Sequence, residues 1–159
     1  MADVVGFDPA IFNTPDGSRP PGFPDRPSSP NGNAETLIYT PVDVVIDRAI
    51  SGPWRPGPGQ FLVEGGTVAV HYVVEDKSID CFTMRVSPVP QVEPGSRYVF
   101  ILSEALDNAG EQPLPLHKAR FAWPVDPAGM VPTPDGPMSI DKLTRLVLDA
   151  TPSLEPRGS

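Results

Sequence analysis

Apolar and polar positions alternate along much of the chain from residue 36 onward. Val42, Val44 and Ile46 fall on one face of an extended backbone, and positions 43, 45 and 47 fall on the other. A period of two residues, built from β-branched side chains, is typical of a half-buried strand. The pattern predicts a strand over residues 36–50 and further strands over 60–64, 67–76, 81–87, 97–104 and 116–125.

Glycine and proline interrupt this alternation in the segment SGPWRPGPGQFLVEGG, residues 51–66. A phosphate-binding loop would need a helix directly after its glycines, because the free N–H groups of the helix must face the anion. Here a strand follows, so the segment is predicted to be a corner between two strands. Gly65 and Gly66 form a two-residue link, which is typical of a hairpin between strands 60–64 and 67–76.

One helix is predicted, over residues 139–150. Ser139 is suited to be its N-cap, Asp141 lies in the first turn, and the sequence Thr151-Pro152 ends it. A helix of this length is marginal alone and must pack on the sheet. Its expected contact face is an apolar stripe made of Ile140, Leu143, Leu146, Val147 and Ala150.

Residues 1–35 have a different texture, with prolines at positions 9, 15, 20, 21, 24, 27 and 30. Proline removes a backbone donor, so this segment is predicted to be an extended, disordered arm or linker. Its apolar stretch 4–12 is expected to dock, on its own domain or on a partner. The folded domain is expected over residues 36–151, and the tail 152–159 resembles a protease-site remnant from an expression vector.

Five or six strands with one helix predict an all-β domain, a small Greek-key or OB-like barrel with a C-terminal helix. In a barrel of this kind the first strand bends and pairs with two neighbours. If residues 36–50 form that strand, Pro41 would occupy a position whose missing N–H is not needed for pairing.

The composition disfavours several classes of partner and location. The net charge is −8, which disfavours nucleic acids and anionic membrane surfaces as partners. No apolar run approaches the roughly 20 residues that cross a bilayer, so membrane insertion is not expected. The chain start lacks the features of a signal peptide. The protein is therefore expected in the cell envelope or outside the cell if a leader has been removed, and in the cytoplasm otherwise.

The reactive side chains are few. Cys81 is the single cysteine, which excludes an intrachain disulfide, and it is expected to be a small buried residue at the start of an apolar strand. His71 and His117 lie on different predicted strands and lack zinc-ligand spacing, and residues 75–80 lack the spacing of a calcium loop. The sequence therefore predicts no catalytic residue, no metal and no cofactor.

Two places are candidates for binding. Trp54 and Arg55 lie in the Gly/Pro corner, where the indole is either a plug over the barrel end or a contact residue. The N-terminal stretch contributes Phe7, Ile11 and Phe12. Residues 121–123, with Phe121 and Trp123 on one side of the last strand, are expected to belong to the core.

Residues 36–150 resemble a group of poorly characterised bacterial exported domains. The matching elements are Ile50-Ser51-Gly52, Gly57, Gly65-Gly66, Pro94-Gly95 and the apolar run 98–102. The resemblance implies an OB-like or netrin/inhibitor-like barrel that acts outside the cytoplasm without catalysis. Animal metalloprotease inhibitors of that fold use an N-terminal cysteine, and Ala2-Asp3 stands here instead, so their mechanism is not expected.

These observations favour a non-catalytic module of the bacterial cell envelope that binds a protein partner or a small ligand, rather than an enzyme. One alternative is a virion or assembly surface protein whose N-terminal arm contacts a neighbouring subunit. A second alternative is an uncharacterised hydrolase that uses carboxylates, although no acid/base pair stands at a convincing spacing. The oligomeric state is left open.

Overall fold

The computed structural model describes residues 1–20, 23, 36–74, 77–84, 91–107 and 112–150. In this part of the chain the strands are β1 (Ala2–Phe7), β2 (Ile11–Phe12), β3 (Ile38–Ile46), β4 (Gly57–Glu64), β5 (Gly66–Val74), β6 (Lys77–Met84), β7 (Arg97–Leu106), β8 (Pro113–Pro124), β9 (Met130–Val131) and β10 (Met138–Ser139). The helix is α1 (Ile140–Ala150). The expected strands and helix are thus present, with shifted boundaries.

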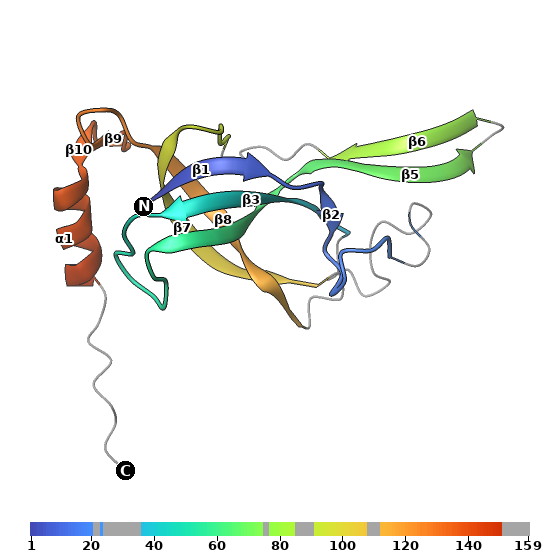
Figure 1. The fold of residues 1–159 in the computed structure, drawn as a ribbon, viewed down its shortest axis with the longest axis horizontal. Coiled ribbons are helices and arrows are strands. Elements are labelled where there is room, and N and C mark those ends of the chain that lie inside the picture. Colours follow the sequence, from blue (N-terminus) through green and yellow to red (C-terminus); the bar gives the residue numbers. More distant parts are fainter. Residues whose placement is uncertain (21–22, 24–35, 75–76, 85–90, 108–111, 151–159) are drawn as a thin grey trace, which may run out of the picture.

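Five strands close a barrel in the order β1-β7-β8-β4-β3, and β3 returns to pair with β1 (Figure 1). Ala2 marks the closure, because it pairs with Ile46 on one side and Tyr98 on the other. Neighbouring strands are antiparallel except β4 and β8, which are parallel. A meander of three strands followed by two strands in reversed order is the arrangement of an OB-like Greek-key barrel. The predicted fold class is confirmed.

The N-terminal segment is part of this barrel, and the prediction of a disordered arm is wrong for residues 1–20 and 23. Val4 is 2% exposed and belongs to the main core. The prolines at positions 9, 15 and 20 lie outside β1 and β2, so they leave the pairing of both strands intact. Residues 21–22 and 24–35 of the predicted arm lie outside the described residues.

The strand predicted to be the first of the barrel is instead β3, and β1 pairs with two neighbours. β3 pairs with β4 along one edge and with β1 and β2 along the other. The carbonyl oxygen of Pro41 accepts a hydrogen bond from Asp8 N at 3.0 Å, between the ends of β1 and β2. The ring nitrogen of Pro41 faces the same gap, so its missing N–H costs no ladder bond, as expected.

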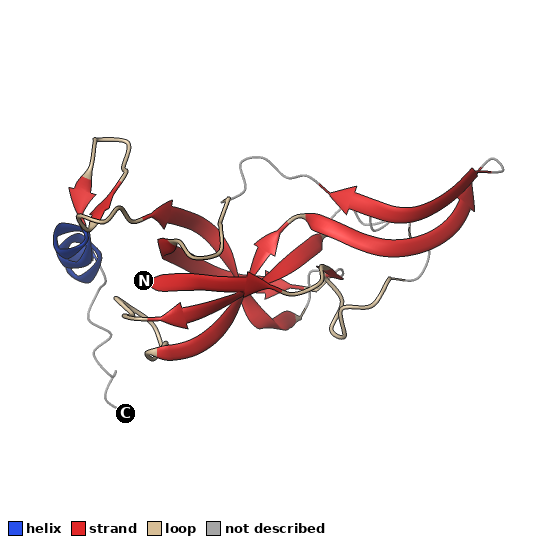
Figure 2. Ribbon diagram, turned by 45° about the horizontal axis from the view of Figure 1, so that its top comes forward, coloured by secondary structure: helices blue, strands red, loops and turns tan. Residues whose placement is uncertain are grey.

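The prediction of a hairpin at Gly65 and Gly66 is wrong. Both edges of β4 are already paired, with β3 and β8, so the chain turns away and β5 pairs with β6 in a separate two-stranded ribbon (Figure 2). The turn is tied to β3, because Gly65 N donates to Ile38 O at 2.7 Å and Thr40 Oγ1 donates to Gly65 O at 2.8 Å. The two glycines correctly predicted a bend and the strand after it was also expected, but the partner of that strand was not.

A second apolar cluster anchors the root of the ribbon. It contains Phe12 and Phe23 from the N-terminal segment, Ile38 of β3, and Val68 and Val70 of β5. The rings of Phe12 and Phe23 meet edge to face at 5.0 Å between centroids. The N-terminal segment therefore also supports the ribbon.

The fold is expected to lose stability in alkaline solution because of Tyr39. Its ring is fully buried, and burial together with the charge of Glu64 raises the pKa of the phenol from 10.0 to about 12. The unfolded chain releases this proton first, so the contribution to stability is complete below pH 10 and falls as the pH rises towards 12.

Between about pH 9 and about pH 11 we expect this titration to lower the free energy of unfolding by about 1.4 kcal/mol, measured with urea. Tyr39→Phe is the matched control, because it keeps the ring and removes the titrating group. Its loss over the same interval should be smaller by that amount. Equal losses in the two proteins would assign the alkaline effect to other groups.

Helix α1 begins as predicted, with Ser139 Oγ accepting a hydrogen bond from Lys142 N at 3.3 Å. Its contact face is narrower than the predicted stripe. Ile140 is buried and Leu143 half-buried against a cluster on the outer face of β7, whereas Leu146 is 49% exposed. The helix therefore touches the barrel mainly through its first turns.

Candidate functional site

A pocket of about 440 Å³ lies between the barrel, the corner that joins β3 to β4, and one face of α1. In Figure 1 the helix stands beside the end of the barrel where the chain begins. The pocket is lined by Met1, Ala2, Ile46, Arg48, Ala49, Ile50, Ser51, Gly52, Pro53, Trp54, Phe61, Val99, Phe100, Ile101, Leu102, His117, Trp123, Leu143 and Val147. Its volume falls within the range of about 300–1,000 Å³ that is typical of small-molecule sites.

Trp54 packs over the core and lines the pocket at the same time. Its ring meets those of Phe61 and His117 edge to face, with centroids 5.1 Å away in each case. A β-carbon on Gly52, where φ is +88°, would lie 3.3 Å from the indole, so the glycine lets the corner fold closely around it. The two interpretations of Trp54, plug and contact residue, are therefore compatible in this geometry.

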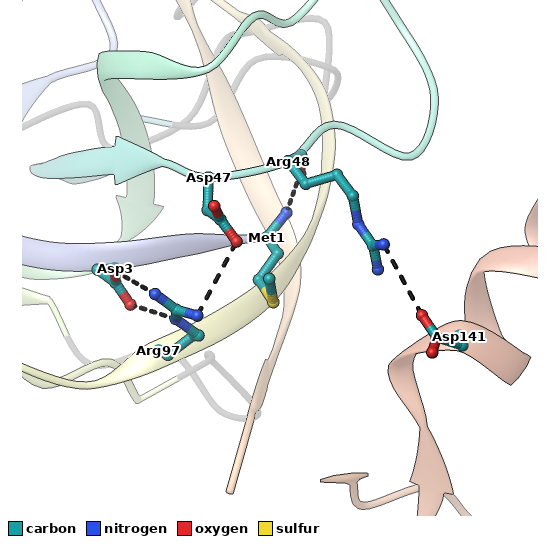
Figure 3. A network of polar contacts seen from close by, with 6 residues as sticks. All are labelled: Met1, Asp3, Asp47, Arg48, Arg97 and Asp141. Carbon is teal, nitrogen blue, oxygen red and sulfur yellow. Dashed lines mark hydrogen bonds and ion pairs between the residues drawn. The ribbon is translucent and has the colours of Figure 1, made fainter. Parts of the chain in front are cut away.

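The polar groups of the pocket include Arg48, which extends from the corner towards α1. Its Nη2 donates to Thr144 Oγ1 at 3.3 Å. Its Nη1 lies 3.8 Å from Asp141 Oδ1 (Figure 3). Its Nε is buried and has no hydrogen-bond partner among the described residues. Arg48 thus links the corner to the helix.

A polar network fastens β1 next to the pocket (Figure 3). Arg97 Nε donates to Asp3 Oδ1 at 2.6 Å and its Nη2 donates to Asp3 Oδ2 at 2.8 Å, a bidentate contact between β7 and β1. Asp47 lies 3.9 Å from the same guanidinium. The hydrogen bonds from Arg97 lower the pKa of the Asp3 carboxyl below its usual value of 3.8. Backbone hydrogen bonds from Asp47 N and Arg48 N to Met1 O, at 3.0 and 3.3 Å, also hold the start of the chain against the end of β3.

The residues predicted to bind do not form one site. Arg55 is exposed beside Trp54 and does not line the pocket. Phe7 and Ile11 lie towards the opposite end of β3, paired with Val42 and Tyr39.

Phe12 is 3% exposed within the cluster at the ribbon root, so its ring is a core group rather than an accessible contact. No local pattern in the sequence indicated Arg48, and Leu143 and Val147 were expected only as part of the contact face of the helix. His117 was a candidate only as a metal ligand. These residues lie on separate segments that the fold brings together.

Two further expectations about side-chain burial are wrong. Cys81 is exposed, because its strand belongs to the two-stranded ribbon rather than to the barrel. Phe121 is 52% exposed on the outer face of β8, where its ring stacks on the half-buried ring of Trp123 at 5.9 Å between centroids.

The other candidate groups lie outside the pocket. His71 Nδ1 is 2.9 Å from Asp80 Oδ1 on the exposed ribbon. Gln60 Nε2 donates to Asp8 Oδ2 and Asp43 Oδ1, both at 2.9 Å, and so ties two carboxylates to the outer face of β4. Among the described residues no group of three or more His, Cys, Asp and Glu side chains could hold a metal ion. Positions 75 and 76 of the calcium-loop candidate lie outside that part of the chain.

The fold and the pocket together define the class of protein: an OB-like barrel with a projecting ribbon, a C-terminal helix and an apolar pocket of ligand size. Comparison with protein-family models, with curated proteins and with solved structures finds no match. In the described ranges, no helix has the length and apolar character that a membrane crossing requires.

Proposed function

We propose that this chain is a non-catalytic binding module that takes a small, largely apolar molecule into the pocket between the barrel and α1. The observation that carries the proposal is the pocket itself, with its volume of about 440 Å³. Its lining combines aromatic rings from the corner and the barrel with aliphatic side chains from the helix. Apolar walls with a few polar groups are the usual composition of small-molecule sites.

The alternatives have less support in the described residues. Strands β1 and β2 pair within their own barrel, so they provide no arm for a neighbouring subunit. Asp8 and Asp43, which a hydrolase could use, are held by Gln60 on the outer surface, away from the pocket. The proposed cellular setting is the bacterial cell envelope, and it rests on the resemblance of residues 36–150 to exported domains.

The test is a titration with N-phenyl-1-naphthylamine, a neutral apolar dye that fluoresces when it leaves water. The wild-type protein should bind one dye molecule per chain. Leu143→Trp places a bulky side chain into the pocket and should weaken dye binding by about tenfold or more.

Leu146→Trp is the matched control, because Leu146 is an exposed leucine of the same helix that does not line the pocket. It should leave dye affinity within about twofold of wild type. Circular dichroism confirms that each variant is folded. A folded wild-type protein that binds no dye, or equal effects of the two substitutions, would overturn the proposal.

A further inference from the structure

The guanidinium of Arg48 has hydrogen-bonding capacity that its neighbours leave unused. Its side chain is 42% exposed, which places it at the mouth of the pocket rather than in its depth. Of its five N–H donors, one on Nη2 serves Thr144, whereas the nearest oxygen of Asp141, at 3.8 Å, is beyond hydrogen-bond distance. The buried Nε has no partner among the described residues.

The local charge of the pocket differs in sign from that of the whole chain. The protein has 20 acidic and 12 Lys or Arg residues. Among the described residues, the ionisable side chains that line the pocket are Arg48 and His117. A guanidinium binds a carboxylate through two parallel N–H donors, and one guanidinium balances one negative charge.

The depth of the pocket has the opposite character. Trp54 and Phe61, which meet edge to face, line it together with Leu143 of the helix. Phe61 is buried in the main core, so a ligand that reaches it leaves water. A cationic mouth above an apolar interior complements a molecule with one anionic end and an apolar body.

We propose that the ligand is an alkyl carboxylate whose head group binds Arg48 and whose chain extends towards Trp54 and Leu143. The inference rests on the proposed binding function and adds the chemistry of the ligand. Asp141 competes weakly with the ligand carboxylate for the guanidinium. Removing its charge therefore strengthens binding of the anion.

The first part of the test compares three ten-carbon probes by isothermal titration calorimetry, each below its micelle concentration. Decanoate has the anionic head, decanol has an uncharged head, and decyltrimethylammonium has a cationic head. In wild-type protein decanoate should bind about tenfold tighter than decanol, and the cationic probe should bind most weakly. Asp141→Asn should increase the affinity for decanoate alone.

The second part uses substitutions at Arg48. Arg48→Met keeps much of the side-chain volume and removes the charge. The affinity for decanoate should therefore fall to that for decanol, and the affinity for decanol should not change. Arg55→Met is the matched control, because Arg55 is an exposed arginine of the same corner that does not line the pocket. Thr144→Val removes the hydrogen bond between Arg48 and the helix, and decanoate should still bind this variant more tightly than decanol does.

The outcomes separate the two proposals. If decanol and decanoate bind wild type equally well, or if Arg48→Met weakens both to the same extent, the carboxylate proposal is wrong and the binding function stands. If none of the three probes binds, the binding function falls as well. Should Arg48→Met fail to fold, the comparison of the three probes on wild type and Asp141→Asn decides.

Discussion

Val4→Asp is expected to abolish the cooperative unfolding transition of the barrel. Val4 is 2% exposed, and β1 closes the barrel by pairing with β3 and β7. A carboxylate at this position has neither water nor a cation, and the cost of about 4 kcal/mol or more is comparable with the whole stability of a domain, about 5–15 kcal/mol. Thermal unfolding followed by circular dichroism measures the effect.

The adjacent residue provides the control. Val5 is 61% exposed on the same strand, so Val5→Asp should cost about 1 kcal/mol or less, from strand propensity alone. A chain that starts at residue 36 lacks β1 and β2 and should likewise fail to fold. If Val4→Asp melted like wild type, β1 would not be part of the barrel, and the N-terminal segment would again be an independent arm.

Gly66→Ala has the second largest expected effect. A β-carbon on Gly66 would lie 2.5 Å from Thr40 Oγ1 and 2.8 Å from the β-carbon of Ala10, and its φ is +142°. Both the backbone conformation and the contacts oppose any side chain there, at the point where the chain leaves the barrel. We expect a loss of about 3 kcal/mol in the free energy of unfolding.

Gly57→Ala separates the two causes of that loss. Gly57 has a φ of +128°, and a β-carbon there would meet nothing within 4 Å. This substitution should therefore cost only the backbone term, about 1 kcal/mol. Equal losses in urea unfolding for the two variants would show that the close contact of Gly66 with β3 contributes nothing.

The parts of the fold that follow a local rule could be predicted from the sequence. The alternation from Val42 to Ile46 marked β3, and Ser139 marked the start of α1 by the hydrogen bond that its side chain can accept. The density of prolines hid β1, although Ala2 and Val4 already alternate with polar or exposed positions. Because the proline content was averaged over 35 residues, it concealed a strand of six residues.

Features that depend on distant segments could not be predicted in this way. Whether the strand after Gly66 pairs with β4 depends on β8, which occupies the other edge of β4 and lies some 50 residues further along the chain. The pocket, too, depends on segments that are distant in the sequence. Trp54 had a local signal, an aromatic side chain in a Gly/Pro corner, whereas Arg48 and Leu143 gain their roles only when the helix returns to the corner.

The central claim, that the pocket between the barrel and α1 holds the ligand, is tested most directly by intermolecular nuclear Overhauser effects between methyl-labelled protein and decanoate. Contacts from the alkyl protons of the ligand to the methyl groups of Leu143 and to the indole of Trp54 are the predicted result. Contacts to the exposed side chains of Leu146 and Leu148 instead, or no contacts at a saturating concentration of decanoate, would contradict the account.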